Sequence, residues 1–181
     1  MRLAALALAA CAHTQPPPAA NPVRDEIERA DAAERARHHE EARTHYERAV
    51  SLAQAPADRE HAHREYAEML AQWGELEAAR DHFEAAIAAA PANPIAWQEL
   101  GIVRNGLGDV PGAFAALEKS KQLAPRAWIP RRDLAVLHWK LGQRAEALAE
   151  YRAMLELELP PRLREKVQWA IDQLTRPPPS S

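Results

Sequence analysis

The sequence predicts an all-α fold in which helical hairpins repeat along the chain and stack on one another. Three glycines, Gly74, Gly108 and Gly142, are spaced 34 residues apart. Pro91 and Pro125 are separated by the same step. Because proline cannot continue a helix, each copy reads as a helix, a glycine turn and a second helix that ends at proline.

Apolar and small residues keep this step and predict which helix faces are buried. The sets are Tyr66, Leu100 and Leu134, then Ala79, Ala113 and Ala147, then Phe83, Leu117 and Tyr151. The alanines allow the two helices of one copy to approach closely, and the larger third set fills the space between copies. No single hairpin can bury its own apolar face, so the copies must stack.

One copy shows the pattern most clearly. It begins at Pro94 and reads Trp97-x-x-Leu100-Gly101, then Gly108, Ala113, Leu117 and Pro125. This order resembles the tetratricopeptide repeat. The resemblance implies repeats stacked into a right-handed superhelical array that is closed by a C-terminal cap helix. The copy departs from the family pattern at Arg104, where an aromatic residue is usual.

Four copies and a last helix, nine helices in all, are predicted to cover residues 23–175. The first copy is degenerate, since Arg37-His38-His39 stands where the turn glycine is expected. Residues 57–59 are interpreted as a short insertion after it. The predicted units are a first repeat at 23–59, repeat 2 at 60–93, repeat 3 at 94–127, repeat 4 at 128–161 and a cap helix at 162–175.

The first ten residues have the order of a secretory signal, with one cation, Arg2, before an apolar run that ends in small residues. The run Leu8-Ala9-Ala10-Cys11 resembles the lipobox of bacterial lipoproteins. That resemblance implies removal of residues 1–10 and lipidation of Cys11, the only cysteine in the chain. The alternative is an unstructured leader in which this sequence arose by chance.

Residues 11–22 are predicted to form a proline-rich tether behind the lipid. Pro16-Pro17-Pro18 favours an extended chain of ~3.1 Å per residue, so the tether reaches up to about 30 Å. Ala12, and not Asp, follows the cysteine. By resemblance to Gram-negative lipoproteins, this favours the outer membrane, facing the periplasm. Residues 176–181 are predicted to be a disordered Pro/Ser tail.

Composition and spacing argue against nucleic-acid binding and catalysis. The chain has 23 basic and 26 acidic residues, so it lacks the excess of positive charge usual in nucleic-acid binders. Six glycines leave little material for a phosphate loop, and one cysteine excludes a disulfide framework. His45 and His82 occupy the same place in successive copies, but without carboxylates at ligand spacing the eight histidines are interpreted as surface residues. We expect no enzyme activity, metal or cofactor.

The family resemblance implies a concave groove lined by the first helix of each repeat. Its predicted residues are Ile95, Gln98, Ile102, Asn105, Ile129, Arg132, Val136 and Trp139. The corresponding positions of repeat 2 include Arg64 facing Glu68, so the groove is expected to be polar at one end and apolar toward the other. The basic and Asn residues with which some relatives hold a C-terminal carboxylate are not reproduced. Trp139 is either an interface anchor or a residue buried against Trp169 of the cap helix.

Three functions fit these observations. The first is a lipid-anchored envelope scaffold that holds a protein or peptide, similar to tetratricopeptide lipoproteins that assist pilus assembly, outer-membrane protein assembly or peptidoglycan enzymes. The second is a module that associates with itself through the stripe Ile95, Ile102, Ile129 and Val136. The third is a cytosolic adaptor with a false lipobox.

Overall fold

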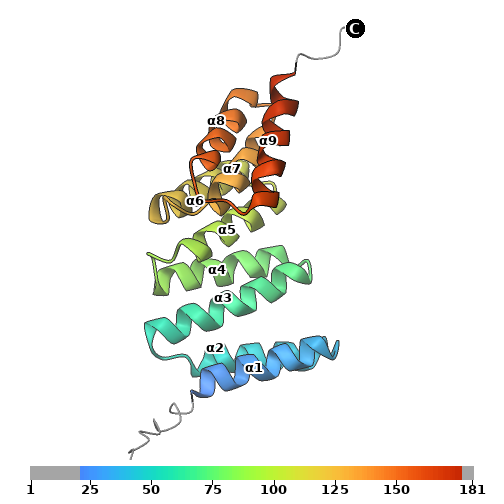
Figure 1. Cartoon of the computed structure of the whole chain (residues 1–181). Coiled ribbons are helices and arrows are strands. Elements are labelled where there is room, and N and C mark those ends of the chain that lie inside the picture. The colour runs from blue at the N-terminus through green and yellow to red at the C-terminus, as the bar shows by residue number, and fades with distance from the viewer. Residues whose placement is uncertain (1–20, 177–181) are drawn as a thin grey trace, which may run out of the picture.

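The computed structural model describes residues 21–176, and within this range the chain forms nine helices and no strand (Figure 1). Cys11, the predicted signal at 1–10, nearly all of the tether and the end of the tail lie outside the described residues. The helices are α1 (Pro22–Arg35), α2 (His39–Leu52), α3 (Pro56–Gln72), α4 (Leu76–Ala89), α5 (Pro94–Gly106), α6 (Val110–Leu123), α7 (Ile129–Lys140), α8 (Arg144–Leu155) and α9 (Pro161–Thr175). None of the helices in this range has the length and apolar character that crossing a membrane requires.

The helices pack as four successive hairpins, and α9 follows them on the last one. Each odd-numbered helix packs on the even-numbered helix that follows it, and α9 packs on α8. Figure 1 shows these layers stacked from α1 at one end to α9 at the other. The contacts of α1 with α3 and of α3 with α5 identify the odd-numbered helices as the inner layer of the stack.

Side-chain caps and prolines fix the starts of several helices. Asn21 Oδ1 accepts a hydrogen bond from the Val23 N–H at 3.0 Å at the start of α1. Asn93 Oδ1 accepts one from the Ile95 N–H at 2.9 Å at the start of α5. In both cases proline is the first helical residue, where its missing N–H leaves no intrahelical bond unmade.

The turn inside each hairpin contains, at the equivalent position, one residue with a positive φ angle. Gly74, Gly108 and Gly142 have φ values of 84°, 81° and 74°. The first hairpin reaches the same geometry with Arg37, whose φ is 62°. Sequence analysis noted that the glycine is missing there, and the structure shows that arginine adopts the strained conformation in its place.

The repeated small and large residues form the core. All three alanines at the predicted helix contacts, Ala79, Ala113 and Ala147, are fully buried. Phe83 is also completely buried, as expected for the set that fills the space between copies. A Cβ atom at Gly101 would lie 2.7 Å from the Leu117 side chain, so α5 and α6 are in direct contact there.

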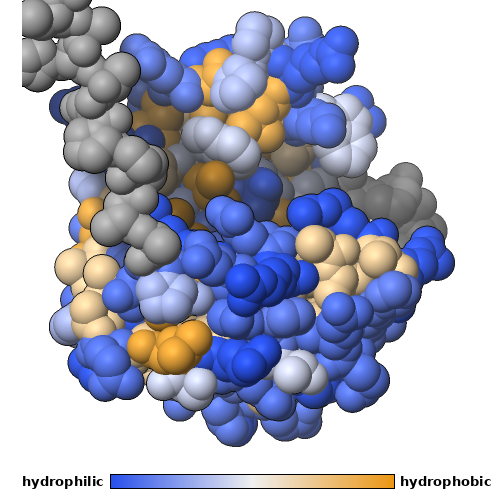
Figure 2. All heavy atoms as spheres, turned by 90° about the horizontal axis from the view of Figure 1, so that it is seen from below, coloured by the Kyte–Doolittle hydropathy of each residue, from blue (hydrophilic) through white to orange (hydrophobic). Residues whose placement is uncertain are grey.

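The two ends of the array differ from a regular repeat. Residues 57–59, interpreted as an insertion, lie within the first turn of α3 and lengthen that helix. At the other end, the stripe Val167, Ala170, Ile171 and Leu174 of α9 is buried. Viewed from the α1 end, the surface is mostly hydrophilic, with hydrophobic residues in separate patches (Figure 2).

Candidate partner-binding groove

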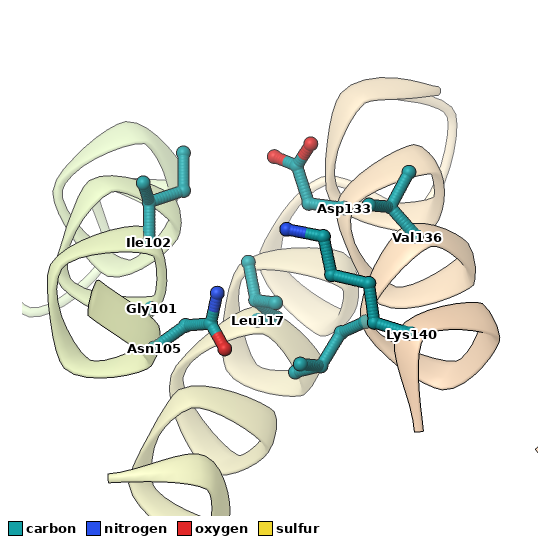
Figure 3. Close-up of a pocket in the computed structure, with 8 residues that line it drawn as sticks. Gly101, Ile102, Asn105, Leu117, Asp133, Val136 and Lys140 are labelled. Atoms are coloured by element: carbon teal, nitrogen blue, oxygen red, sulfur yellow. The ribbon is translucent and has the colours of Figure 1, made fainter. Parts of the chain in front are cut away.

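Three of the predicted groove residues, Ile102, Asn105 and Val136, line a hollow of about 220 Å³ between α5 and α7. Ile102 and Asn105 of α5 stand on one side, and Asp133, Val136 and Lys140 of α7 on the other (Figure 3). Gly101 and Leu117 contribute to its lining. The structure therefore brings together three of the eight predicted residues here.

Aliphatic side chains on the inner layer are unusually exposed around this hollow. Ile102 and Val136 line it and are 43% and 37% exposed, and Ile95, about two turns away at the start of α5, is 51% exposed. Large apolar residues that stand in water beside a concavity are typical of a binding surface.

Gln98 does not serve as a groove contact, because its side chain is already used inside the array. It is 9% exposed, and its Nε2 atom donates to Asp133 Oδ2 at 3.0 Å. Asp133 Oδ1 also accepts from Arg132 Nε at 2.8 Å. This bridge from α5 to α7 fixes the relative position of the two helices. Ile129 is half-buried at the start of α7.

A second hollow, of about 290 Å³, lies between α7 and α9. It shares Val136 with the first and adds Arg132 and Trp139 of α7 to its lining. The Trp139 ring lies 6.3 Å from the Trp169 ring, measured between centroids. Trp139 thus packs against Trp169 of α9 and also lines an open hollow, and its use as an interface anchor stays a prediction.

Sequence analysis missed the contribution of α9 to the groove. Lys166 and Trp169 line the second hollow, and Trp169 is 60% exposed. The sequence indicates an exposed position for Trp169, because this residue lies outside the apolar stripe of α9 that packs on the array. A large aromatic residue outside the buried stripe of an amphipathic helix is a candidate surface anchor.

The part of the inner layer between α3 and α5 contains two neighbouring carboxylates. Glu68 of α3 and Glu99 of α5 line a hollow of about 270 Å³. Burial raises the pKa of the Glu99 carboxyl, and the negative charge of Glu68 raises it further. Burial also raises the pKa of Glu68, against the neighbouring Arg64 guanidinium, which contacts it at 2.5 Å. This is the polar end expected from the sequence.

His45 and His82, which occupy the same place in successive copies, have different partners in the structure. His45 contacts Glu26 at 2.6 Å, whereas His82 lies 3.0 Å from His63 between Nδ1 atoms. Burial lowers the pKa of both His63 and His82, so the neutral rings are favoured in the folded state. Between residues 21 and 176, no three potential ligand side chains are grouped to hold a metal ion.

Solved structures resemble this arrangement along most of the chain. No protein-family model matches the sequence, and no curated protein matches it in a sequence comparison. The crystal structure of MamA has a TM-score of 0.65 and 20% identity, covering 81% of this chain and 81% of MamA. PilF of Pseudomonas aeruginosa has a TM-score of 0.68 and 18% identity, covering 84% of this chain and 67% of PilF.

A third solved structure is the first tetratricopeptide domain of Spaghetti (RPAP3), bound to the HSP90 peptide SRMEEVD. It has a TM-score of 0.57 and 17% identity, covering 65% of this chain and 94% of that domain. The chain has the tetratricopeptide-repeat fold. At these identities the likeness concerns the fold alone. All three hollows are lined mainly by residues of α3, α5, α7 and α9, the odd-numbered helices of the inner layer.

Proposed function

We propose that this protein is a lipid-anchored scaffold of the bacterial cell envelope that holds a segment of a partner protein in its concave groove. The observation that carries the binding function is the hollow between α5 and α7, with Ile102 and Val136 exposed around it. Covering these side chains removes apolar surface from water, at roughly 25 cal/mol per Å².

The size and rim of this hollow favour a peptide side chain over a metabolite. Its volume of about 220 Å³ is below the roughly 300–1,000 Å³ usual for small-molecule pockets. Asn105 and Lys140 around it supply donors and an acceptor for the main chain of a bound segment. The peptide complex of the Spaghetti domain supports the same use of this fold.

Membrane attachment is the second part of the proposal, and the Leu8-Ala9-Ala10-Cys11 sequence supports it. A chain bearing two or more acyl groups at Cys11 is held stably by a bilayer, whereas one acyl chain binds only marginally. In native cells, Cys11→Ala is expected to release the protein from the membrane fraction. Mass spectrometry of the N-terminal peptide tests lipidation directly, and an unmodified Met1 would refute the anchor.

Binding in the groove is tested by crosslinking in native envelopes and identification of the proteins that co-purify. Ile102→Glu and Val136→Glu place charge in the hollow at exposed positions and are expected to remove the recurrent partner. Leu52→Glu is the matched control, because Leu52 is 44% exposed on α2, outside the inner layer. Unchanged recovery with both groove variants would contradict the groove assignment.

Self-association is the alternative use of the same exposed aliphatic side chains. In that case two copies would cover Ile95, Ile102 and Val136 mutually, in a symmetric interface. Analytical ultracentrifugation of the full chain in detergent separates the two functions. A monomer at micromolar concentration excludes the homodimer. If the wild type is a dimer and Val136→Glu dissociates it, the groove binds a second copy and not another protein.

A further inference from the structure

Three tryptophans lie along the end of the concave face, where α9 closes the array. We call this surface the tryptophan strip and define it by Trp128, Arg132, Trp139, Leu163, Lys166 and Trp169. These residues line two neighbouring hollows that share Leu163 and Lys166. The Arg132 guanidinium stacks over the Trp128 ring at 5.5 Å, and the Trp139 and Trp169 rings are 6.3 Å apart.

The charged side chains that line the two hollows are all basic. Arg132 and Lys166 line the hollow between α7 and α9, and Arg162 with Lys166 lines its neighbour. No carboxylate lines either hollow in the part of the chain that the structure describes. Arg132 is partly neutralised by Asp133, at 2.7 Å, whereas Lys166 is exposed at the edge of both hollows. The strip thus combines an aromatic surface with positive charge.

Tryptophan and arginine are the residues that most often carry the binding energy of protein interfaces. Trp169 is 60% exposed, so a partner that covers it removes a large apolar surface from water. The hollow of about 290 Å³ beside it can receive a large side chain. The cations at the rim favour a partner that carries carboxylates next to that side chain.

The shape of the strip favours a narrow protein segment over a bilayer. The apolar surface is recessed between two helices, whereas a lipid surface requires a protruding one. Glu165 and Asp172 are exposed on α9 but line neither hollow, so the positive charge is confined to the hollows themselves. A bilayer is too wide to enter the space between α7 and α9, whereas an extended segment can follow it.

We infer that the tryptophan strip binds an acidic protein segment that inserts one large apolar side chain between Trp139 and Trp169. This inference rests on the proposed function and names the class of segment that the C-terminal end of the groove accepts. Lys166 and Arg132 pair with the flanking carboxylates, and the tryptophans cover the inserted side chain.

The test uses the full-length chain in detergent and three short fluorescent peptides. The first has one phenylalanine between runs of aspartate, the second has asparagine for every aspartate, and the third has alanine for the phenylalanine. Fluorescence anisotropy measures binding at low and high salt. We expect the first peptide to bind at least about tenfold more tightly than either of the others, with an affinity that falls as salt rises.

Variants of the strip locate the site. Lys166→Glu and Trp169→Ala change exposed side chains and are expected to weaken binding of the first peptide about tenfold or more. Lys119→Glu, an exposed lysine on α6, is the matched control and is expected to leave binding unchanged. Circular dichroism confirms that all three variants keep their helix content.

Each contrary result overturns the inference in a recognisable way. Equal binding of the aspartate and asparagine peptides refutes the acidic segment. If only Ile102→Glu removes binding, the segment binds between α5 and α7. That result retains the proposed function and refutes the inference about the tryptophan strip. A shift of tryptophan emission that phosphatidylglycerol vesicles produce, the peptide does not produce and Trp169→Ala removes assigns the strip to lipid. Dissociation of a dimer by Lys166→Glu assigns it to a second copy. If none of the peptides binds and the crosslinked envelopes give no partner, both proposals fail.

Discussion

Replacing Arg37 by glycine is expected to stabilise the first hairpin. Arg37 has a φ of 62° at the turn between α1 and α2, where the other three hairpins have glycine. Its N–H donates to the Glu34 carbonyl at 2.8 Å, and the next N–H, that of His38, donates to the Ala33 carbonyl at 2.9 Å. The same two bonds surround Gly74, so glycine at position 37 requires no backbone movement.

The size of the effect follows from two opposing contributions. Holding a residue with a Cβ atom in the left-handed region costs roughly 1–2 kcal/mol. Glycine is more flexible in the unfolded chain, which offsets about 0.4–1 kcal/mol of that gain. Arg37→Gly should therefore raise the free energy of unfolding by about 0.8 kcal/mol. For a domain of this size, that corresponds to an increase in Tm of about 2–3 °C.

Thermal unfolding followed by circular dichroism measures the shift, and hydrogen exchange of α1 and α2 amides shows whether it is local. Arg37→Ala is the first control, because it removes the side chain and keeps the strained backbone. Gly74→Ala is the second, because a Cβ there meets nothing within 4 Å and only the backbone is strained, so a loss of similar size is expected. If Arg37→Ala stabilises as much as Arg37→Gly, the arginine side chain and not the φ angle is the cause.

Three further changes test the core, the histidine pair and the contact between α5 and α6. Phe83→Ala empties a fully buried site and should cost about 3–5 kcal/mol in urea unfolding. Because burial lowers the pKa of His63 and His82, the unfolded chain binds more protons than the folded chain. The free energy of unfolding should therefore decrease as the pH is lowered below about 6.5. His82→Phe should reduce that pH dependence in unfolding curves measured from acid to neutral pH, and an unaltered slope would contradict this. Gly101→Ala should lower the Tm of the protein more than Gly106→Ala does. The new Cβ at position 101 would lie 2.7 Å from the Leu117 side chain of α6, whereas a Cβ at position 106 meets only the tip of the Leu76 side chain at 3.0 Å. Equal Tm values would show that α5 and α6 adjust freely.

The fold could be predicted from the sequence because its determinants are local and repeat. Glycine at the turns, alanine at the helix contacts and proline at the helix ends each act within a few residues, and the period shows that they act together. The left-handed turn of the first hairpin has no such marker. Arginine at position 37 adopts it because the flanking helices are fixed by packing, and no local preference of the residue predicts that.

The groove could be predicted only in part, because its details depend on contacts between distant residues. Gln98 has a groove position in the repeat, but its partner Asp133 is 35 residues away and turns it into an internal bridge. The hollow beside Trp139 depends on how α9 packs on α8, where Arg144 donates to the carbonyls of Leu174 and Arg176. The repeat period carries no information about the placement of this last helix, so the sequence predicts Trp169 only as a candidate packing partner of Trp139.

The charges of the concave face give the groove a direction. Glu68 and Glu99 stand at the α3–α5 end, exposed aliphatic residues follow, and Lys166 stands at the α9 end. Burial and mutual repulsion raise the pKa of the Glu99 carboxyl, so a cation brought by a partner relieves an existing strain there. At the opposite end, the positive charges of Lys166 and Arg132 favour an acidic group. A segment long enough to cross the whole face would thus bind with its basic part over α3 and its acidic part over α9, and reversing its sequence would oppose like charges at both ends.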